Sequence, residues 1–173
     1  MAMKGRGYQK TLWDYQERPV ASSKLNGWDD QIEHALEVVH EMLALAWGGG
    51  DGVVRGATDL NLKVVPTSPP SLAVVVGAGR AFISRFVYKL AADSVTETVA
   101  VPTDNPRIDL VVARLADWTV AIIKGTESAV PEAPATGMDE IVLAELYLRP
   151  GMGSIEDNDD GTNGYITDRR AFV

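Results

Sequence analysis

The sequence predicts a mainly β protein, an antiparallel β-sandwich or small barrel preceded by an extended N-terminal arm and one amphipathic α-helix. Short runs of β-branched and aromatic residues, separated by turn-forming residues, follow one another from residue 72 onward in this 173-residue chain. A single segment, 28–47, has helical periodicity. The β-type runs do not alternate with helices, which argues against a doubly wound α/β fold.

Residues 1–27 are predicted to form the extended arm. They hold five basic residues against two acidic ones, although the whole chain has a net charge of −8. Glycines and a proline break any regular element, yet apolar and aromatic side chains cluster there, which is unusual for a disordered tail. We therefore expect an arm that becomes ordered on a neighbouring surface through Tyr8, Leu12, Trp13 and Tyr15; a solvated, flexible terminus is the alternative.

Residues 28–47 are predicted to form the helix. Asn26 is a plausible cap, Asp29 and Asp30 lie near the positive N-terminal end, and Gly48 begins the glycine run that ends the helix. Its apolar stripe must be buried against the chain's own β domain or against copies of itself around a symmetry axis. The expected interface residues of the helix are Trp28, Ile32, Leu36, Val39 and Leu43.

A Gly/Pro-rich connector, 48–71, is expected next, with possible short strands at Val53–Val54 and within 60–65. The β domain is predicted over 72–173. A turn at Ala116-Asp117 indicates a hairpin there. The expected strands are 72–76, 81–90, 95–101, 108–115, 118–124, 141–148 and 165–168.

Composition limits the chemistry. The chain has no cysteine, which excludes disulfides, thiolate metal sites and a cysteine nucleophile. His34 and His40 are six residues apart, so they lie about 120° apart around a helix and do not form a metal pair. The acidic body is a poor partner for nucleic acid. No apolar run approaches the ~18 residues that cross a bilayer, and the charged N-terminus lacks the apolar region of a secretory signal. We expect no metal, no cofactor, no nucleic-acid partner and no membrane partner.

Two polar groups are predicted to be structural. Arg107 and Asp109 are two apart in a strand, so they share a face, where a buried charge requires a partner. We expect them to pair, or Arg107 to bond loop carbonyls, and Asp168 to pair with a neighbouring arginine. The loop 156–164 concentrates oxygen ligands, but it lacks the glutamate that closes an EF-hand; an Asx-rich turn is favoured over weak cation binding. No carboxylate pair lies in an apolar context, and no catalytic residue is predicted.

Five motifs occur in order within 72–173, and together they resemble a β module of structural proteins of tailed bacteriophages, especially baseplate and tail-fibre attachment proteins. The motifs are Val76-Gly-Ala-Gly-Arg-Ala-Phe-Ile-Ser, Asn105-Pro-Arg-Ile-Asp-Leu-Val-Val, Lys124-Gly-Thr with the following proline loop, Ile141-Val-Leu-Ala-Glu-Leu-Tyr-Leu and Ile166-Thr-Asp-Arg-Arg.

The resemblance implies a virion protein near the neck, tail or baseplate, made in the host bacterial cytoplasm and assembled as a trimer or hexamer with other phage structural proteins. It also implies that Arg107, Asp109, Asp168 and Arg169 define the fold and are not catalytic. The chain stops after Thr-Asp-Arg-Arg-Ala-Phe-Val without a fibre or lectin-like domain, so we expect an adaptor that attaches fibres or spikes.

Two other functions are compatible with the sequence. One is a carbohydrate-binding module for host-surface recognition, with Trp118, Tyr147 or Tyr165 as stacking platforms. The other is a small hydrolase that uses paired carboxylates.

Overall fold

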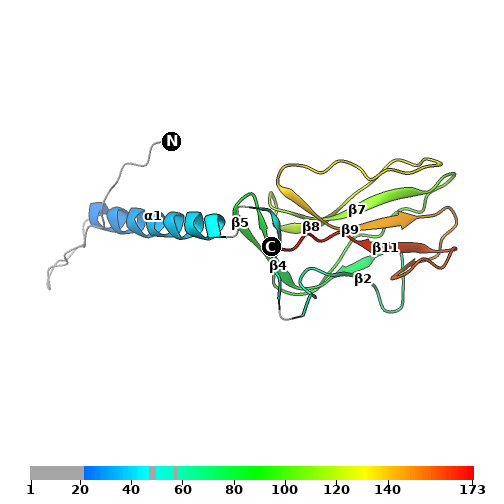
Figure 1. The fold of residues 1–173 in the computed structure, drawn as a ribbon, viewed down its shortest axis with the longest axis horizontal. Helices are drawn as coiled ribbons and strands as arrows, with labels where there is room; N and C mark the ends of the chain where they lie inside the picture. The colour runs from blue at the N-terminus through cyan, green and yellow to red at the C-terminus, as the bar shows by residue number, and fades with distance from the viewer. Residues whose placement is uncertain (1–21, 47–49, 57) are drawn as a thin grey trace. The chain divides into compact units, whose positions relative to one another are not determined.

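The computed structural model describes residues 22–46, 50–56 and 58–173. The chain divides into two compact units, 1–49 and 50–173, and each is considered by itself. The first unit contains helix α1, Ser22–Ala46 (Figure 1). The second contains the β-strands. The predicted arm residues Tyr8, Leu12, Trp13 and Tyr15 lie outside the described residues.

Helix α1 begins six residues before the predicted start at residue 28. Leu25 continues the apolar stripe by one step toward the N-terminus, and the serines at 22 and 23 are of a type favoured at helix starts. Gly27 costs an interior helix position only about 1 kcal/mol, so it does not break the helix. Asn26 is therefore not the cap, and no acidic residue lies in the first turn.

The described part of the second unit contains eleven strands in three sheets. Several are only two or three residues long. Their bounds are β1 Gly52–Val53, β2 Val64–Pro66, β3 Val74–Val76, β4 Gly79–Ile83, β5 Phe86–Leu90, β6 Ser94–Val95, β7 Arg107–Arg114, β8 Thr119–Ile123, β9 Glu140–Leu148, β10 Ile155–Glu156 and β11 Gly164–Asp168.

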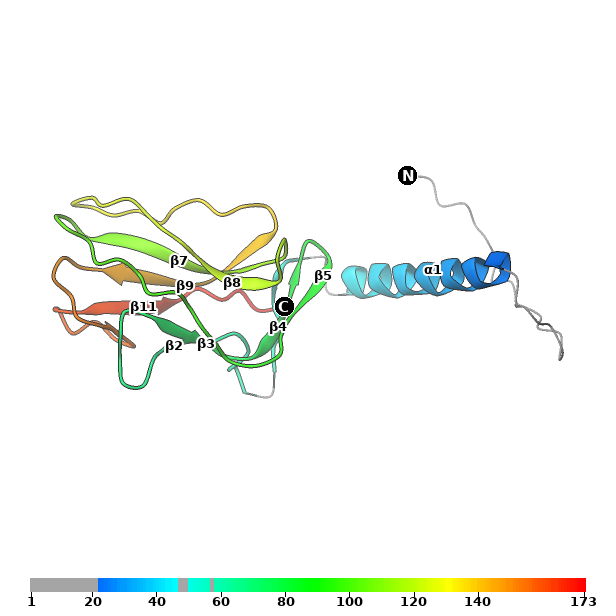
Figure 2. The ribbon, with the colours of Figure 1, turned by 180° about the vertical axis from the view of Figure 1, so that it is seen from behind.

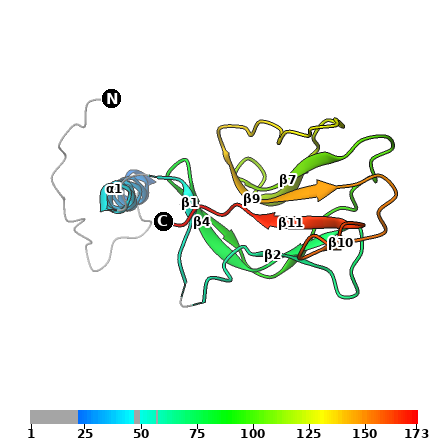
Figure 3. The same cartoon turned by 45° about the vertical axis from the view of Figure 1, so that its right-hand side comes forward.

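The largest sheet has the order β10-β11-β9-β7-β8, and two three-stranded sheets have the orders β1-β4-β5 and β2-β3-β6. Every pairing between named strands is antiparallel except that of β10 with β11. Figure 2 shows β2 and β3 beside the large sheet, and Figure 3 shows β11 between β9 and β10. The unit is a sandwich-like mainly β fold without a closed barrel, as the sequence predicts.

Strand β7 lies inside the large sheet because its sequence is apolar on both faces. Leu110 to Ala113 are all buried, and β7 pairs with β8 on one side and β9 on the other. The pairing with β9 shifts register between Val111 and Val112. Residues from all three sheets form one buried apolar cluster, so the sheets share a core.

The last residues of the chain pair with β1. The Val53 amide donates to the carbonyl of Ala171 at 2.7 Å, and the Val173 amide donates to the carbonyl of Val53 at 3.1 Å. The last residues therefore extend the pairing of β1, and residues 50–53 and 171–173 lie side by side.

Three predicted boundaries are wrong. The segment 81–90 is a hairpin of two strands, because Ser84 and Arg85 take positive φ angles of 50° and 71° and turn the chain. The short strands expected within the connector 48–71 are present as β1 and β2, but the β unit begins at residue 50 and not at 72, so the described residues of the connector belong to it. Of the predicted strand 95–101, only Val95 lies in a strand.

Candidate assembly surface

The apolar stripe of helix α1 is exposed to solvent. The exposed fractions are 48% for Leu25, 52% for Trp28, 46% for Ile32, 55% for Leu36 and 50% for Val39. At 100° per residue these positions fall within about 80° around the helix axis. The stripe therefore contains the predicted interface residues Trp28, Ile32, Leu36 and Val39, and Leu25 is an additional member; the side chain of Leu43 lies outside the described set.

An exposed apolar stripe leaves a helix without the packing that normally stabilises it. Helices in water gain most of their stability from packing an apolar face, and isolated helices are marginal. A row of large, half-exposed apolar side chains marks a surface that binds another surface. The stripe of α1 is therefore the candidate assembly surface.

Arg107 and Asp109, two of the polar residues predicted to be structural, bond to each other. Both side chains are 1% exposed. The Arg107 Nε donates to Asp109 Oδ1 at 2.8 Å and Nη2 donates to Oδ2 at 3.1 Å. Arg107 also bonds the carbonyl of Ala100, and Asp109 accepts from the Gly125 amide at 2.9 Å. The predicted pair and the predicted carbonyl contact are both confirmed.

Glu127 extends this cluster. Its Oε2 accepts the amides of Thr103 and Asp104, each at 3.1 Å, and its Oε1 lies 3.8 Å from Arg107 Nη1. The Asp104 amide is the largest cause that lowers the pKa of Glu127. The cluster therefore joins the loop before β7 to the loop after β8, and its hydrogen-bonding groups face the protein.

Asp168 pairs with Arg170, which confirms the predicted pairing with a neighbouring arginine. Arg170 Nη2 lies 2.7 Å from Asp168 Oδ2, and its Nη1 donates to the carbonyls of Asp59 and Asn61. Arg169, the arginine implied by the resemblance, instead makes an exposed pair with Glu145 at 3.0 Å. The sequence leaves open which of the two arginines pairs with Asp168, because nothing in it shows that residues 59 and 61 lie within reach of Arg170.

Arg149, like Glu127, is not among the residues predicted from the sequence. Both oxygens of Asp159 accept from its Nη2 at 2.9 Å, and its guanidinium lies 5.0 Å from the Tyr147 ring centre and 5.3 Å from that of Tyr165. The two tyrosine rings stack on each other at 5.2 Å. These contacts occupy part of the ring surface that a sugar would need, so this pair is a weak glycan platform.

The loop 156–164 is an Asx-rich turn, as favoured from the sequence. Asp160 Oδ1 accepts the amides of Thr162 and Asn163 at 2.8 and 2.7 Å, and Oδ2 accepts from the Asn163 side chain. The Asn163 amide is the first of the causes that lower the pKa of Asp160 to about 2. These carboxylate oxygens are directed at donors of the loop. The described residues contain no group of three or more potential metal ligands.

Trp118 differs from the two tyrosines because it is about half-exposed. It has a positive φ of 58° and lies between β7 and β8, with its ring parallel to that of buried Tyr88 at 6.3 Å. Burial raises the pKa of Tyr88, and the nearby negative charge of Asp117 adds to the effect. The Tyr88 hydroxyl makes no hydrogen bond within the described part of the chain.

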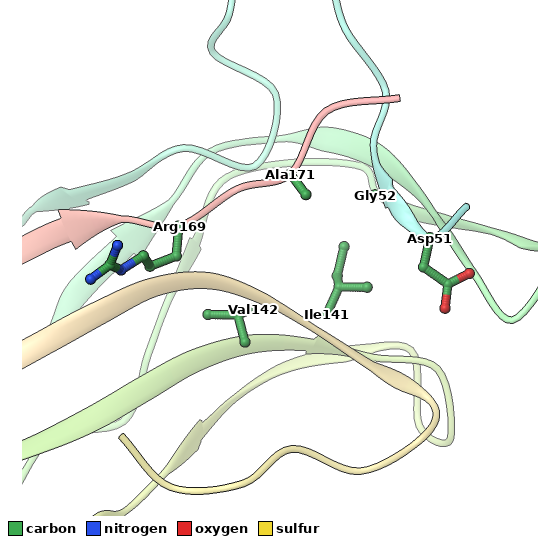
Figure 4. A pocket seen from close by; sticks show the side chains of 6 residues that line it. All are labelled: Asp51, Gly52, Ile141, Val142, Arg169 and Ala171. Carbon is green, nitrogen blue, oxygen red and sulfur yellow. The ribbon is translucent and has the colours of Figure 1, made fainter. Parts of the chain in front are cut away.

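One cavity of about 180 Å³ lies between the beginning of β9 and the end of the chain. Figure 4 shows Ile141, Val142 and Ala171 around an apolar centre, with the charged ends of Asp51 and Arg169 directed away from it. Asp51 accepts from the Ser84 amide, and Arg169 bonds Glu145. The cavity is smaller than the ~300 Å³ of ordinary ligand pockets and lacks convergent polar groups.

No family model, curated protein or solved structure matches this chain. Among the described residues, no helix is long and apolar enough to span a membrane.

Proposed function

We propose that this chain is a structural protein of a tailed bacteriophage, an oligomeric adaptor at the tail, baseplate or neck that attaches fibres or spikes to the particle. The phage assignment is supported by the ordered motifs within residues 72–173. The observation that carries the assembly role is the exposed apolar stripe of α1.

The polar groups of the β unit support a scaffold role in preference to a chemical one. Arg107, Asp109, Glu127 and Arg170 each bond backbone groups from loops or from distant parts of the chain. Such bonds fix loop positions around a rigid core. They leave the hydrogen-bonding atoms of these residues directed at the protein and not at a substrate.

Carbohydrate binding is the alternative function, and Trp118 is the residue that best fits it. Its exposed ring could stack on a sugar, since aromatic faces are suited to that contact. Trp118 is not among the residues that line the cavity beside β9, and the centre of that cavity is apolar. The structure therefore favours the adaptor proposal over glycan binding.

Light scattering of the full chain beside residues 50–173 tests the proposal. The buried cluster of the β unit contains only residues from 53 onward, so this fragment keeps its whole core. We expect a trimer or hexamer for the full chain and a folded monomer for the fragment. Two monomers would contradict self-assembly, and glycan binding that Trp118→Ala abolishes would favour the alternative function.

A further inference from the structure

The stripe of α1 follows an eleven-residue repeat. Its members Leu25, Trp28, Ile32, Leu36 and Val39 are separated by three, four, four and three residues, so Leu25 recurs as Leu36 and Trp28 recurs as Val39. In one register a heptad would place Ala35 in the stripe in place of Leu36, and in the other it would place Asp29 there in place of Trp28. An eleven-residue repeat corresponds to 3.67 residues per turn, slightly more than the 3.6 of an α-helix, and produces a weak right-handed supercoil.

Charge divides the two flanks of this stripe. Measured around the axis from Ile32, Asp29 lies about 60° and Glu33 about 100° to one side. Ala35 and Gln31 lie at the same angles on the other side and carry no charge. The stripe therefore has one acidic flank and one uncharged flank over residues 29–35.

This asymmetry distinguishes the possible orientations of two copies. In parallel packing around an axis, the acidic flank of each helix meets the uncharged flank of its neighbour. In an antiparallel pair, the two acidic flanks lie along the same seam, where like charges oppose association. The charge pattern thus selects parallel packing.

We propose that α1 binds the same helix of further copies of this chain, parallel and in register, in a bundle that is nearly straight or weakly right-handed. This inference rests on the self-association in the proposed function and adds its orientation and its repeat. Equivalent residues then meet at the same level of the bundle, with Leu25 close to Leu25 and Leu36 close to Leu36.

Single cysteines in the full chain test this arrangement, because the natural sequence has none. A disulfide requires Cα atoms within about 7 Å. Leu25→Cys should give a covalent dimer on oxidation only if the helices are parallel, because an antiparallel helix of this length moves the second residue 25 tens of ångströms away. Leu36→Cys lies near the helix centre and should cross-link in either orientation.

Further variants serve as controls. Ala35→Cys is compared with Leu36→Cys, and Asp29→Cys with Trp28→Cys, because a heptad bundle would cross-link the first member of one of these pairs better than the second. Asp30→Cys lies on the far side of the helix and should stay monomeric on a denaturing gel. Circular dichroism confirms that each variant keeps its helix.

The outcomes test the parallel orientation and the eleven-residue repeat separately. We expect efficient cross-linking at 25, 28 and 36 and weak cross-linking at 29, 30 and 35. Cross-linking at 36 without 25 would overturn the parallel arrangement while leaving self-association intact. Stronger cross-linking at 35 than at 36, or at 29 than at 28, would overturn the eleven-residue repeat. No cross-linking at either 25 or 36, with a monomeric mass, would overturn both proposals and indicate that the stripe is covered within one chain.

Discussion

Arg107 and Asp109 carry opposite charges in an environment that excludes water almost completely. Their paired hydrogen bonds, together with the carbonyl of Ala100 and the amide of Gly125, satisfy groups that burial would otherwise penalise. Arg169 and Glu145 form an ion pair that is open to solvent. The environment of each pair, and not its formal charge, determines its contribution to stability.

Replacing one member of the buried pair is expected to be costly. Asp109→Asn removes the nearer of the two carboxylates beside buried Arg107 and leaves only Glu127, 3.8 Å away, which should lower the free energy of unfolding by about 3 kcal/mol. Arg169→Met removes an exposed pair and should change it by less than about 1 kcal/mol. Urea unfolding followed by fluorescence measures both changes. Equal changes would show that the buried pair contributes no more to stability than the exposed pair.

Asp160 gives a pH-dependent prediction. Its pKa is lowered from 3.8 to about 2 by hydrogen bonds that the ionised carboxylate accepts. Since the folded pKa is depressed, the stabilisation is present above the unfolded value near 4 and is lost as pH falls through 2. An NMR titration of the side-chain carboxyl should give a midpoint near 2. A midpoint close to 3.8 would contradict the hydrogen-bonded turn, and Asp160→Asn identifies the resonance.

At the scale of elements, Gly27 and Gly125 differ in whether the surrounding structure leaves room for a side chain. Gly27 lies inside α1, and a side chain there would meet no atom within 4 Å. At Gly125, beside β7, a Cβ would overlap the carbonyl oxygen of Ile108. The same substitution should therefore have opposite effects at the two positions.

Gly27→Ala should stabilise α1 by about 1 kcal/mol, because alanine is the better helix former and the position is open. Gly125→Ala should destabilise the β unit by about 1–3 kcal/mol, because the backbone must move to admit the methyl group. Thermal unfolding followed by circular dichroism measures each change. A stabilising Gly125→Ala would show that this close approach is absent.

The sequence predicts long elements better than short ones. The apolar run of β7 and its hairpin with β8 follow from β-propensity and a turn signal, and both are present. The hairpin at Ser84-Arg85 escaped prediction because neither residue is typical of a turn with positive φ. The predicted start of α1 lies six residues too late, because a glycine such as Gly27 is a poor helix former and favours a start after it.

The candidate surface could be predicted from sequence where it depends on periodicity within one element. Ile32, Leu36 and Val39 were identified in this way, and the structure shows them exposed. The bonds of Arg170 to residues 59 and 61 depend on contacts between distant parts of the chain, and no local pattern encodes them.

At the scale of the whole molecule, the chain combines a β unit with its own core and a helix whose apolar stripe is exposed. In the proposed function this stripe joins copies of the chain. If so, the assembly should depend on the stripe and not on the opposite side of α1, where Asp30 and His34 lie about 160° from its centre.

The most direct test is the solution mass of the full chain measured by light scattering for two matched double variants. Ile32→Gln/Leu36→Gln changes the stripe, and Asp30→Gln/His34→Gln changes the opposite face with the same replacement residue. We predict that the natural chain and the second variant are oligomers of equal mass, whereas the first variant is a monomer with its β unit intact. An unchanged oligomer in the first variant would contradict the role of the stripe.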